Sequence, residues 1–334
     1  MPTEQTQEEL ILAFLVEAGD DYTSGEALSD KLGLSRTAVW KHVEGLRLKG
    51  YRIEALSARG YRLTGVPDRL TSLELSPLLG TRELGAVIHA HDSVPSTNDA
   101  AFALAQEGAE HGEVVVAERQ TRGKGRRGRV WESPPGLNLY LSVVLRPELP
   151  PQRAPELTLV GAVAVAETLR EAGAAADIKW PNDVLVAGRK VAGLLTELSA
   201  DTERIRFAIL GIGVNLNARR EDFPPELAAQ ATSLREARGE AVPRALFTAA
   251  LLANLERWLN VHAERGFEPV RERWTALSCT LGREVLVTSE RSELRGTAVE
   301  IDAAGALVVR TADGRVERIL SGDVESLRAK KSKP

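Results

Sequence analysis

The segment QTRGKGRRGRVW (residues 120–131) places five cationic side chains and three glycines between Gln120 and Trp131. Because glycine lacks a Cβ atom, the backbone N–H groups at Gly123, Gly125 and Gly128 can approach an anion closely. Lysine and arginine side chains beside them neutralise a phosphate or a carboxylate. Basic segments are also typical of nucleic-acid-binding arms and of solvated loops. The segment alone therefore leaves three interpretations open.

Two other segments carry neutral polar groups at the ends of predicted elements. SVPSTNDA presents Ser96, Thr97 and Asn98 just before a helix, where hydroxyl and amide groups can bind a neutral polar ligand. Taken alone, this segment favours the simpler interpretation that one of these side chains caps the helix. In LGIGVNLN the glycines of a buried strand permit the close approach of a ligand, and Asn215 stands at the polar end.

A fourth segment, IKWPNDVLVAGRKVAG, predicts two strands joined by a turn at residues 181–183. The turn brings Lys179 and Asp183 to one end of the sheet, and Lys190 follows a second turn. A carboxylate beside cations suits the handling of Mg²⁺ and phosphate. The alternative is an ordinary hairpin with surface charges.

The overall composition narrows the function classes. The net charge is −4 although 27% of the 334 residues are charged, so nucleic-acid affinity must come from a local cluster. Cys279 is the only cysteine, which excludes an internal disulfide, and the five scattered histidines form no zinc-binding pattern. The polar, acidic N-terminus and the lack of an apolar run of about 18 residues predict a cytoplasmic protein without a membrane partner.

The N-terminal region predicts three helices and a β-hairpin with a DNA-reading surface. The helices are expected over residues 8–19, 24–33 and 35–50, and the hairpin over 51–64. Ser24 and Ser35 are the expected N-caps, and the spacing of Val39, Val43 and Leu46 predicts a buried face on the third helix. Side chains placed to read DNA, on the other face of that helix and on the hairpin wing, are Arg36, Thr37, Trp40, Lys41 and Arg59. The alternative is a protein-interaction module with a solvated basic face.

The chain is too long for one hydrophobic core, so several domains are expected. We predict a winged helix-turn-helix domain over 1–66 (helix-turn-helix about 25–44), a catalytic domain over 67–278, a small barrel over 279–328 and a disordered tail over 329–334. The segment 65–75 is expected to be a linker. In the middle region short apolar strands alternate with long helices at 98–108, 154–173 and 244–266, which predicts a mixed sheet of the α+β or α/β class. Strands at 282–289, 295–302, 305–311 and 315–324 predict a small barrel, which would hide its strand edges.

In their order and spacing, STN, RQTRGKGRRGR with the following tryptophan, KWPNDVLVAGRKVAGLLTEL and GIGVNLN resemble the biotin protein ligase family. With a winged helix in front and a barrel behind, the chain from about 8 to 328 is similar to the bifunctional members that also repress a biotin operon. The resemblance implies a class II aminoacyl-tRNA-synthetase-like catalytic sheet and an SH3-like C-terminal barrel.

The resemblance also implies a reaction and a set of site residues. Biotin and ATP would condense to biotinyl-5′-AMP, which then acylates one lysine of a biotin carboxyl carrier protein. The biotin-binding residues implied are Ser96, Thr97, Asn98, Gln120, Lys124, Gly125, Arg126, Lys190 and Gly193. The adenylate-binding residues implied are Arg126, Arg127, Arg129, Trp131 and Asn215, with Trp131 against adenine. Lys190, Arg126, Lys179 and Asp183 would serve the reaction, and Asp183 would also serve Mg²⁺.

The same resemblance implies that biotinyl-AMP orders the basic loop, promotes homodimerisation and lets two winged helices bind operator DNA. The loop is then expected to be mobile when empty. One departure from the family pattern is Lys124, because the family loop commonly has arginine there and lysine lacks the planar fork. Two alternatives remain: a non-catalytic biotin-sensing transcription regulator, and a lipoate ligase that shares the catalytic fold.

Overall fold

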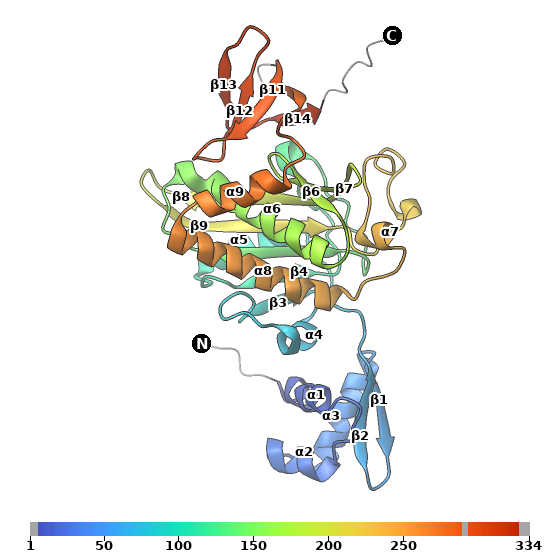
Figure 1. The fold of residues 1–334 in the computed structure, drawn as a ribbon. Coiled ribbons are helices and arrows are strands. Elements are labelled where there is room, and N and C mark those ends of the chain that lie inside the picture. Colours follow the sequence, from blue (N-terminus) through green and yellow to red (C-terminus); the bar gives the residue numbers. More distant parts are fainter. Residues whose placement is uncertain (1–5, 289–292, 327–334) are drawn as a thin grey trace.

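The computed structural model describes residues 6–288 and 293–326, arranged as three regions in chain order (Figure 1). A helical unit with a hairpin leads into a seven-stranded sheet, and a five-stranded sheet follows. Within the described ranges, no helix is both long and apolar enough to cross a bilayer. The predicted tail at 329–334 lies outside the described residues.

The N-terminal unit has the predicted form. It consists of α1 (Gln7–Glu17), α2 (Gly25–Leu32), α3 (Arg36–Leu48) and an antiparallel hairpin of β1 (Arg52–Leu56) and β2 (Gly60–Gly65). The caps at Ser24 and Ser35 are confirmed, since each side chain accepts a hydrogen bond from the backbone N–H three residues later. The apolar face of α3 is also confirmed, because Val39, Val43 and Leu46 are fully buried.

The segment expected to be a linker contains a short helix, α4 (Ser72–Leu75), so the prediction was wrong there. Glu74 of this helix is buried and accepts a hydrogen bond from the hydroxyl of Tyr51 at 2.6 Å. Burial, with help from the Glu74 carboxylate, raises the pKa of Tyr51 well above its ordinary value, so the phenol remains a donor. A single helical turn shows no periodicity in sequence, and this one is stabilised by tertiary contact.

Arg244, the first residue of α8 (Arg244–Arg265), fixes the connecting segment on the sheet. Its side chain is 1% exposed and donates from Nη1 to Oε2 of Glu118 at 2.9 Å. It also donates to the backbone carbonyl of Asp68, and the backbone N–H of Leu70 donates to Oε1 of Glu118 at 2.8 Å. A buried guanidinium is tolerated only when carboxylate and carbonyl oxygens replace its hydration. One ion pair thus holds both the segment and the strand end that carries Glu118.

The seven-stranded sheet has the order β3-β4-β5-β9-β8-β7-β6. Its strands are β3 (Ile88–His91), β4 (Val114–Ala117), β5 (Leu139–Leu145), β6 (Ala176–Lys179), β7 (Asp183–Val186), β8 (Arg189–Ala200) and β9 (Ile205–Val214). Only the β3–β4 pair is parallel among these ladders, so the predicted mixed sheet is confirmed. β4 ends at Ala117, so Gln120 lies beyond the strand.

Helices cover both faces of this sheet (Figure 1). They are α5 (Thr97–Glu107), α6 (Ala154–Glu171), α8 and α9 (Glu268–Leu277), and a short α7 (Leu234–Arg238) lies beyond the strand ends. Alternate residues point to opposite faces: Val115 packs in the cluster with α5, whereas Val114 packs in the larger cluster with α6. The sequence analysis missed α7 and α9, although the i, i+4, i+7 spacing of Val270, Trp274 and Leu277 was a usable signal for α9.

The C-terminal sheet has the order β13-β12-β11-β10-β14. Its strands are β10 (Glu284–Thr288), β11 (Glu293–Ile301), β12 (Leu307–Arg310), β13 (Val316–Ile319) and β14 (Asp323–Ser326). The single strand predicted over 315–324 is two strands on opposite edges, because the chain bends at Leu320 and Ser321. The described part of the chain shows no ladder between β13 and β14 that would close the predicted barrel.

Replacing Arg244 by methionine should lower the free energy of unfolding by about 3 kcal/mol, because Glu118 would remain buried without its cation. Urea denaturation followed by tryptophan fluorescence measures the change. Arg295→Met removes an exposed partner of Glu284 and should cost less than about 0.5 kcal/mol. Equal effects of the two substitutions would contradict the role given to Arg244.

Candidate active site

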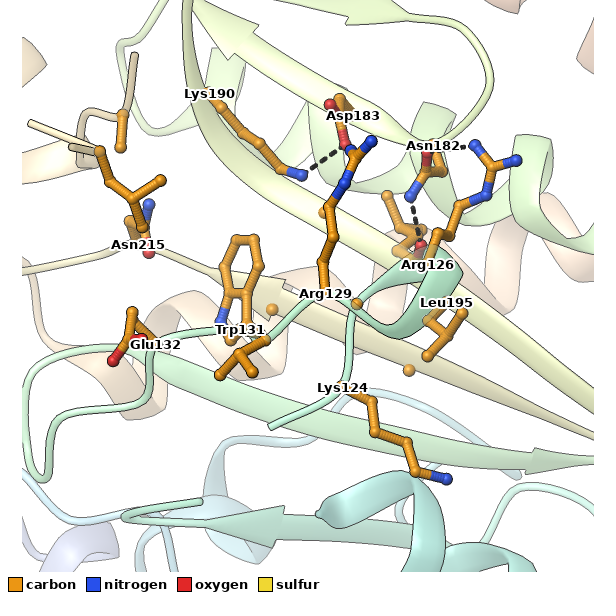
Figure 2. A pocket seen from close by; sticks show the side chains of 18 of the residues that line it. Lys124, Arg126, Arg129, Trp131, Glu132, Asn182, Asp183, Lys190, Leu195 and Asn215 are labelled. Carbon is orange, nitrogen blue, oxygen red and sulfur yellow. Dashed lines mark hydrogen bonds and ion pairs between the residues drawn. The ribbon is translucent and has the colours of Figure 1, made fainter. Parts of the chain in front are cut away.

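A cavity of about 780 Å³ opens at the ends of β8 and β9 and beneath the basic loop. Figure 2 shows part of its lining, with Trp131, Arg129 and Lys190 gathered around the hollow. The sequence-predicted residues that line it are Ser96, Thr97, Asn98, Gln120, Lys124, Gly125, Arg126, Arg129, Trp131, Lys179, Asp183, Lys190, Gly193 and Asn215. Segments far apart in the sequence therefore converge on one space.

One end of the cavity is built from neutral polar groups. Oε1 of Gln120 accepts hydrogen bonds from the backbone N–H and the hydroxyl of Thr97 at 2.8 and 3.1 Å. The amide of Gln120 donates to Oγ of Ser133 at 3.0 Å, and Oγ of Ser142 donates to Oδ1 of Asn98 at 2.7 Å. These contacts fix the orientation of both amides, so the end presents defined donors and acceptors.

Ser96 stands at the N-cap position of α5, yet its side chain makes no capping hydrogen bond. The capping interpretation that SVPSTNDA alone favoured is therefore wrong for Ser96. Thr97 and Asn98 lie inside the helix with their side chains engaged across the cavity end. All three side chains are almost completely buried, which suits a binding role better than a solvated cap.

Glycines form the floor beneath these groups. A Cβ atom on Gly211 would lie 2.1 Å from Oδ1 of Asn98, and one on Gly213 would lie 2.6 Å from the indole of Trp131. A Cβ on Gly193 would also crowd that indole, at 3.1 Å. The close approach predicted for the β9 glycines is thus made by the chain's own side chains, which any larger residue would displace.

The turn between β6 and β7 has the predicted geometry. Lys179 and Asp183 are direct cross-strand partners, and Nζ of Lys190 lies 2.6 Å from Oδ1 of Asp183. The same ammonium stands 5.3 Å from the ring centroid of Trp131 (Figure 2). Asp183 and Lys190 together therefore place one negative and one positive charge on the cavity wall beside an aromatic face.

Lys124 of the basic loop points toward the neutral polar end. The ammonium of Lys124 forms ion pairs with Asp99 of α5 and with Glu197 of β8, the second at 3.1 Å. Its hydrogen bond to Asp99 is the main cause that raises the pKa of Lys124 above the ordinary lysine value. The group is therefore a cation at neutral pH.

The later cations of the loop face the C-terminal sheet. Arg126 donates to Oδ1 of Asn182 at 3.1 Å and to the carbonyl of Gly322 at 3.3 Å. Arg127 and Arg129 both pair with Asp323, the former at 3.3 Å. Arg127 is absent from the cavity lining, whereas Arg126 and Arg129 contribute to it.

Burial lowers the pKa of Arg126, and the negative charges of Asp323 and Asp183 act in the opposite direction. Arginine nevertheless stays ionised throughout the physiological range. Arg126 therefore brings a weakly hydrated cation to the cavity, where an anion would gain more from pairing than it would on the open surface.

Sequence reasoning missed several partners of the loop, namely Asp99, Asn182, Glu197 and Asp323. Asp99 directly follows the STN run, so its position beside the site could have been noticed. Glu197 lies 73 residues from Lys124, and Asp323 lies 194 residues from Arg129. No local pattern signals contacts over such separations.

The side chains around Asp183 determine whether the predicted magnesium site can hold the ion. Across residues 6–288 and 293–326, no cluster of three or more His, Cys, Asp or Glu side chains could hold a metal ion. Asp183 offers one carboxylate that is paired with Lys190. Such a site suits Mg²⁺ only when substrate phosphates and water complete the octahedron, which is the usual situation for this ion.

A second candidate surface lies on the N-terminal unit. The predicted DNA-reading side chains Arg36, Thr37, Trp40, Lys41 and Arg59 are all exposed. Trp40 is 52% exposed, which is unusual for so large an apolar side chain. Arg36 pairs with Glu26 at 3.2 Å, and the guanidinium of Arg59 lies 5.1 Å from the ring of Tyr22. These side chains are accessible to a partner along one helix and one hairpin tip.

Three family models match the chain. The biotin/lipoate A/B protein ligase family matches residues 90–215, an HTH domain matches 7–62, and the biotin protein ligase C-terminal domain matches 280–326. Over 316 residues the chain is 40% identical to the bifunctional ligase/repressor BirA of Bacillus subtilis, covering 94% of this chain and 97% of that protein. The chain belongs to the bifunctional biotin protein ligase family.

Other members of the biotin protein ligase family agree with this assignment. BirA of Escherichia coli is 33% identical over 316 residues, covering 94% of this chain and 96% of that protein. A biotin protein ligase from Aquifex aeolicus, solved in complex with biotin and ATP, has a TM-score of 0.63 and 31% identity, covering 73% of this chain and 99% of that one. The family resemblance predicted from the motifs is therefore confirmed.

Proposed function

We propose that this protein is a biotin protein ligase that forms biotinyl-5′-AMP from biotin and ATP and then transfers biotin to a carrier-protein lysine. The observation that carries the proposal is one cavity with a neutral polar end and a cationic end, in a chain that matches bifunctional ligase/repressors along nearly its whole length. Biotin has a neutral ureido ring at one end and a carboxylate at the other, so the two ends of the cavity suit the two ends of this substrate.

In the first step a biotin carboxylate oxygen attacks the α-phosphorus of ATP. The bond to the β-phosphate oxygen breaks, and pyrophosphate leaves. Because both reactants are anions, the main needs are alignment and neutralisation rather than a protein nucleophile. We assign neutralisation to Arg126, Arg129 and Lys190, which bring cations to the cavity from the loop and from β8.

In the second step the amine of the acceptor lysine attacks the acyl carbon, AMP leaves, and the nitrogen loses a proton. The proposed roles of Asp183 and Lys179 lie here and in phosphate handling, at the β6–β7 turn. We propose that Asp183 also holds Mg²⁺, which would offset phosphate charge when bound with ATP.

The remaining site roles are proposed by similarity. Ser96, Thr97, Asn98, Gln120 and Gly193 would line the biotin ring, with Gly125 and the backbone of Lys124 along its carboxylate. Trp131, Asn215, Arg127 and Arg129 would serve the adenylate. In the structure Arg127 is engaged by Asp323 and by the carbonyl of Thr288, so its role requires release from these partners.

We also propose a repressor function for the N-terminal unit. Support comes from the HTH match and from the exposed recognition-helix side chains on α3. Biotinyl-AMP would order the loop and promote a homodimer whose two winged helices bind operator DNA. The carrier is proposed to be the biotin carboxyl carrier protein of a carboxylase. The expected cytoplasmic location stays a prediction.

The domain division into residues 1–66, 67–278 and 279–328 is part of the proposal. We further infer an SH3-like barrel for the last unit and a class II synthetase-like arrangement for the central sheet. A bulge between Ala298 and Glu300 of β11 supports the first inference, because bulges bend strands in small barrels.

The central proposal predicts that the chain, given labelled biotin, MgATP and a biotin carrier domain, labels the carrier and releases pyrophosphate. Folded protein that leaves the carrier unlabelled would contradict it. Biotin binding without pyrophosphate release would instead support the non-catalytic sensor, and labelling with lipoate in place of biotin would support the lipoate ligase.

Arg126→Ala should release biotinyl-AMP at least about tenfold faster, because a charge-assisted contact of roughly 1.5–3 kcal/mol is lost. Rapid dilution of the preformed complex measures the rate. Arg122→Ala removes the same charge from an exposed position of the same loop and should leave the rate within about twofold. Similar rates for the two variants would argue against the role of Arg126.

Gly211→Ala should weaken biotin binding by at least about tenfold, because the new methyl group occupies the place of the Asn98 amide oxygen. Calorimetric titration measures the affinity. Gly80→Ala, where no atom lies within 4 Å of the added Cβ, is the matched control. If the folded Gly211→Ala variant binds biotin with unchanged affinity, Asn98 is not part of the biotin site.

The repressor proposal predicts that a biotin-synthesis promoter is shifted in gels at physiological salt only with biotin and ATP present. A double Arg36→Ala, Lys41→Ala variant should bind at least about tenfold more weakly, while its ligase activity stays unchanged. If the unaltered protein gives no ligand-dependent shift, the repressor proposal is wrong, and the ligase proposal is unaffected.

A further inference from the structure

Lys124 behaves differently from the other cations of the basic loop. Its ammonium pairs with Asp99, in the first turn of α5, and with Glu197 of β8. In Figure 2 its side chain points away from Lys190 and Trp131, which mark the charged part of the cavity. The charge of Lys124 is therefore directed to the neutral polar end of the cavity.

Glu197 connects this ion pair to the polar end itself. Oε1 of Glu197 accepts from Lys124 at 3.1 Å, and Oε2 accepts from Nδ2 of Asn98 at 2.8 Å. On the other side, Oδ1 of Asn98 accepts from Ser142 at 2.7 Å. Nδ2 of Asn98 also donates to the backbone carbonyl of Leu195 on β8, at 3.3 Å. A carboxylate and a carbonyl can only accept, so Glu197 and the Leu195 carbonyl together determine which atom of the Asn98 amide faces β8 and which faces Ser142.

Asn98 has little space for any other arrangement. Its side chain is 4% exposed, and the position of a Cβ on Gly211 lies 2.1 Å from its Oδ1. Close packing and hydrogen bonds thus hold the amide in one position. Loss of the Glu197 contact would leave one N–H of this buried amide without an acceptor, which is unfavourable because the group cannot reach water.

Lys124 is what keeps Glu197 in this position. Asp99 and Glu197 share one ammonium, so without it two carboxylates would face each other close to the cavity. Like charges at such range repel, and the half-exposed Asp99 and the less exposed Glu197 would turn toward solvent. The Asn98 amide would then lose the shorter of its two hydrogen bonds to β8 and keep only the one to the Leu195 carbonyl.

We propose that Lys124 is a positioning residue that holds Glu197, and through it the Asn98 amide, in the orientation that receives the biotin ureido group. The inference rests on the proposed function, and its own claim is that the Lys124 ammonium acts without touching the biotin carboxylate. It assigns roles in substrate recognition to Glu197 and Asp99. It also explains why a lysine serves at this position, since a compact ammonium bridges two carboxylates without a planar fork.

The competing role for Lys124 is a direct contact between its ammonium and the biotin carboxylate. Removal of the Glu197 side chain distinguishes this direct role from the proposed indirect one. If Lys124 met the ligand directly, removal of Glu197 would free the ammonium and remove a negative charge, so biotin would bind equally well or more tightly. If Lys124 acts through Glu197, the same removal leaves the Asn98 amide held on β8 only by its longer bond to the Leu195 carbonyl, so binding weakens. The two roles predict opposite signs.

The experiment is calorimetric titration of the full chain with biotin and with neutral biotinamide. Lys124→Met and Glu197→Ala should each weaken both ligands by about tenfold, the double variant should be no worse than either, and Lys124→Arg should retain most of the affinity. Glu203→Ala, an exposed acid on the turn between β8 and β9, makes the same charge change and should leave both affinities unchanged. Thermal melting verifies that each variant is folded.

The inference is overturned if Lys124→Met weakens biotin alone, or if Glu197→Ala leaves affinity unchanged or improved. Should a variant fail to fold, Asp99→Asn at its partly exposed site provides the test, with an expected loss of about threefold for both ligands. Failure of the proposed function is visible separately in the unaltered chain, which would then bind neither ligand or would bind biotin without releasing pyrophosphate from ATP.

Discussion

The cavity depends on the neutralisation of one basic loop by groups drawn from distant parts of the chain. Lys124 forms an ion pair with Glu197 of β8, whereas Arg129 forms one with Asp323, the first residue of β14. Cations so close together repel one another, and the carboxylates that pair with Lys124, Arg127 and Arg129 offset this repulsion where the loop covers the cavity. The loop consequently joins the central sheet to the C-terminal sheet, and an anionic ligand must compete with the carboxylates already present.

A second buried cation connects the cavity to the N-terminal unit. Arg244 binds Glu118, and Glu118 precedes Gln120 by two residues on the chain that enters the basic loop. The same carboxylate accepts from Leu70 in the connecting segment, and Tyr51 bonds Glu74 a little further along. The polar end of the cavity and the helix-turn-helix unit are thus attached to one strand end, which gives a physical connection between the cavity and that unit.

Local features were predictable because their causes are local. The caps at Ser24 and Ser35 and the buried stripe through Val43 follow from hydrogen bonding and periodicity within a few residues. Predictions failed where tertiary contact decides: α4 is a single turn stabilised by Tyr51, and Ser96 makes no capping hydrogen bond. The four motifs were correctly grouped by their resemblance to one family, not by any one of their patterns.

By itself the sequence determined the residue types of the site, the order of the elements and the family to which the chain belongs. Glycines at 211 and 213 and the cations of the loop are visible in sequence as unusual composition. Only the tertiary structure decided that Lys124 faces Glu197 while Arg129 faces Asp323. The physical reason is that ion pairs and close packing depend on distance in space, which strand order and chain folding set, whereas composition and periodicity report only on neighbours along the chain.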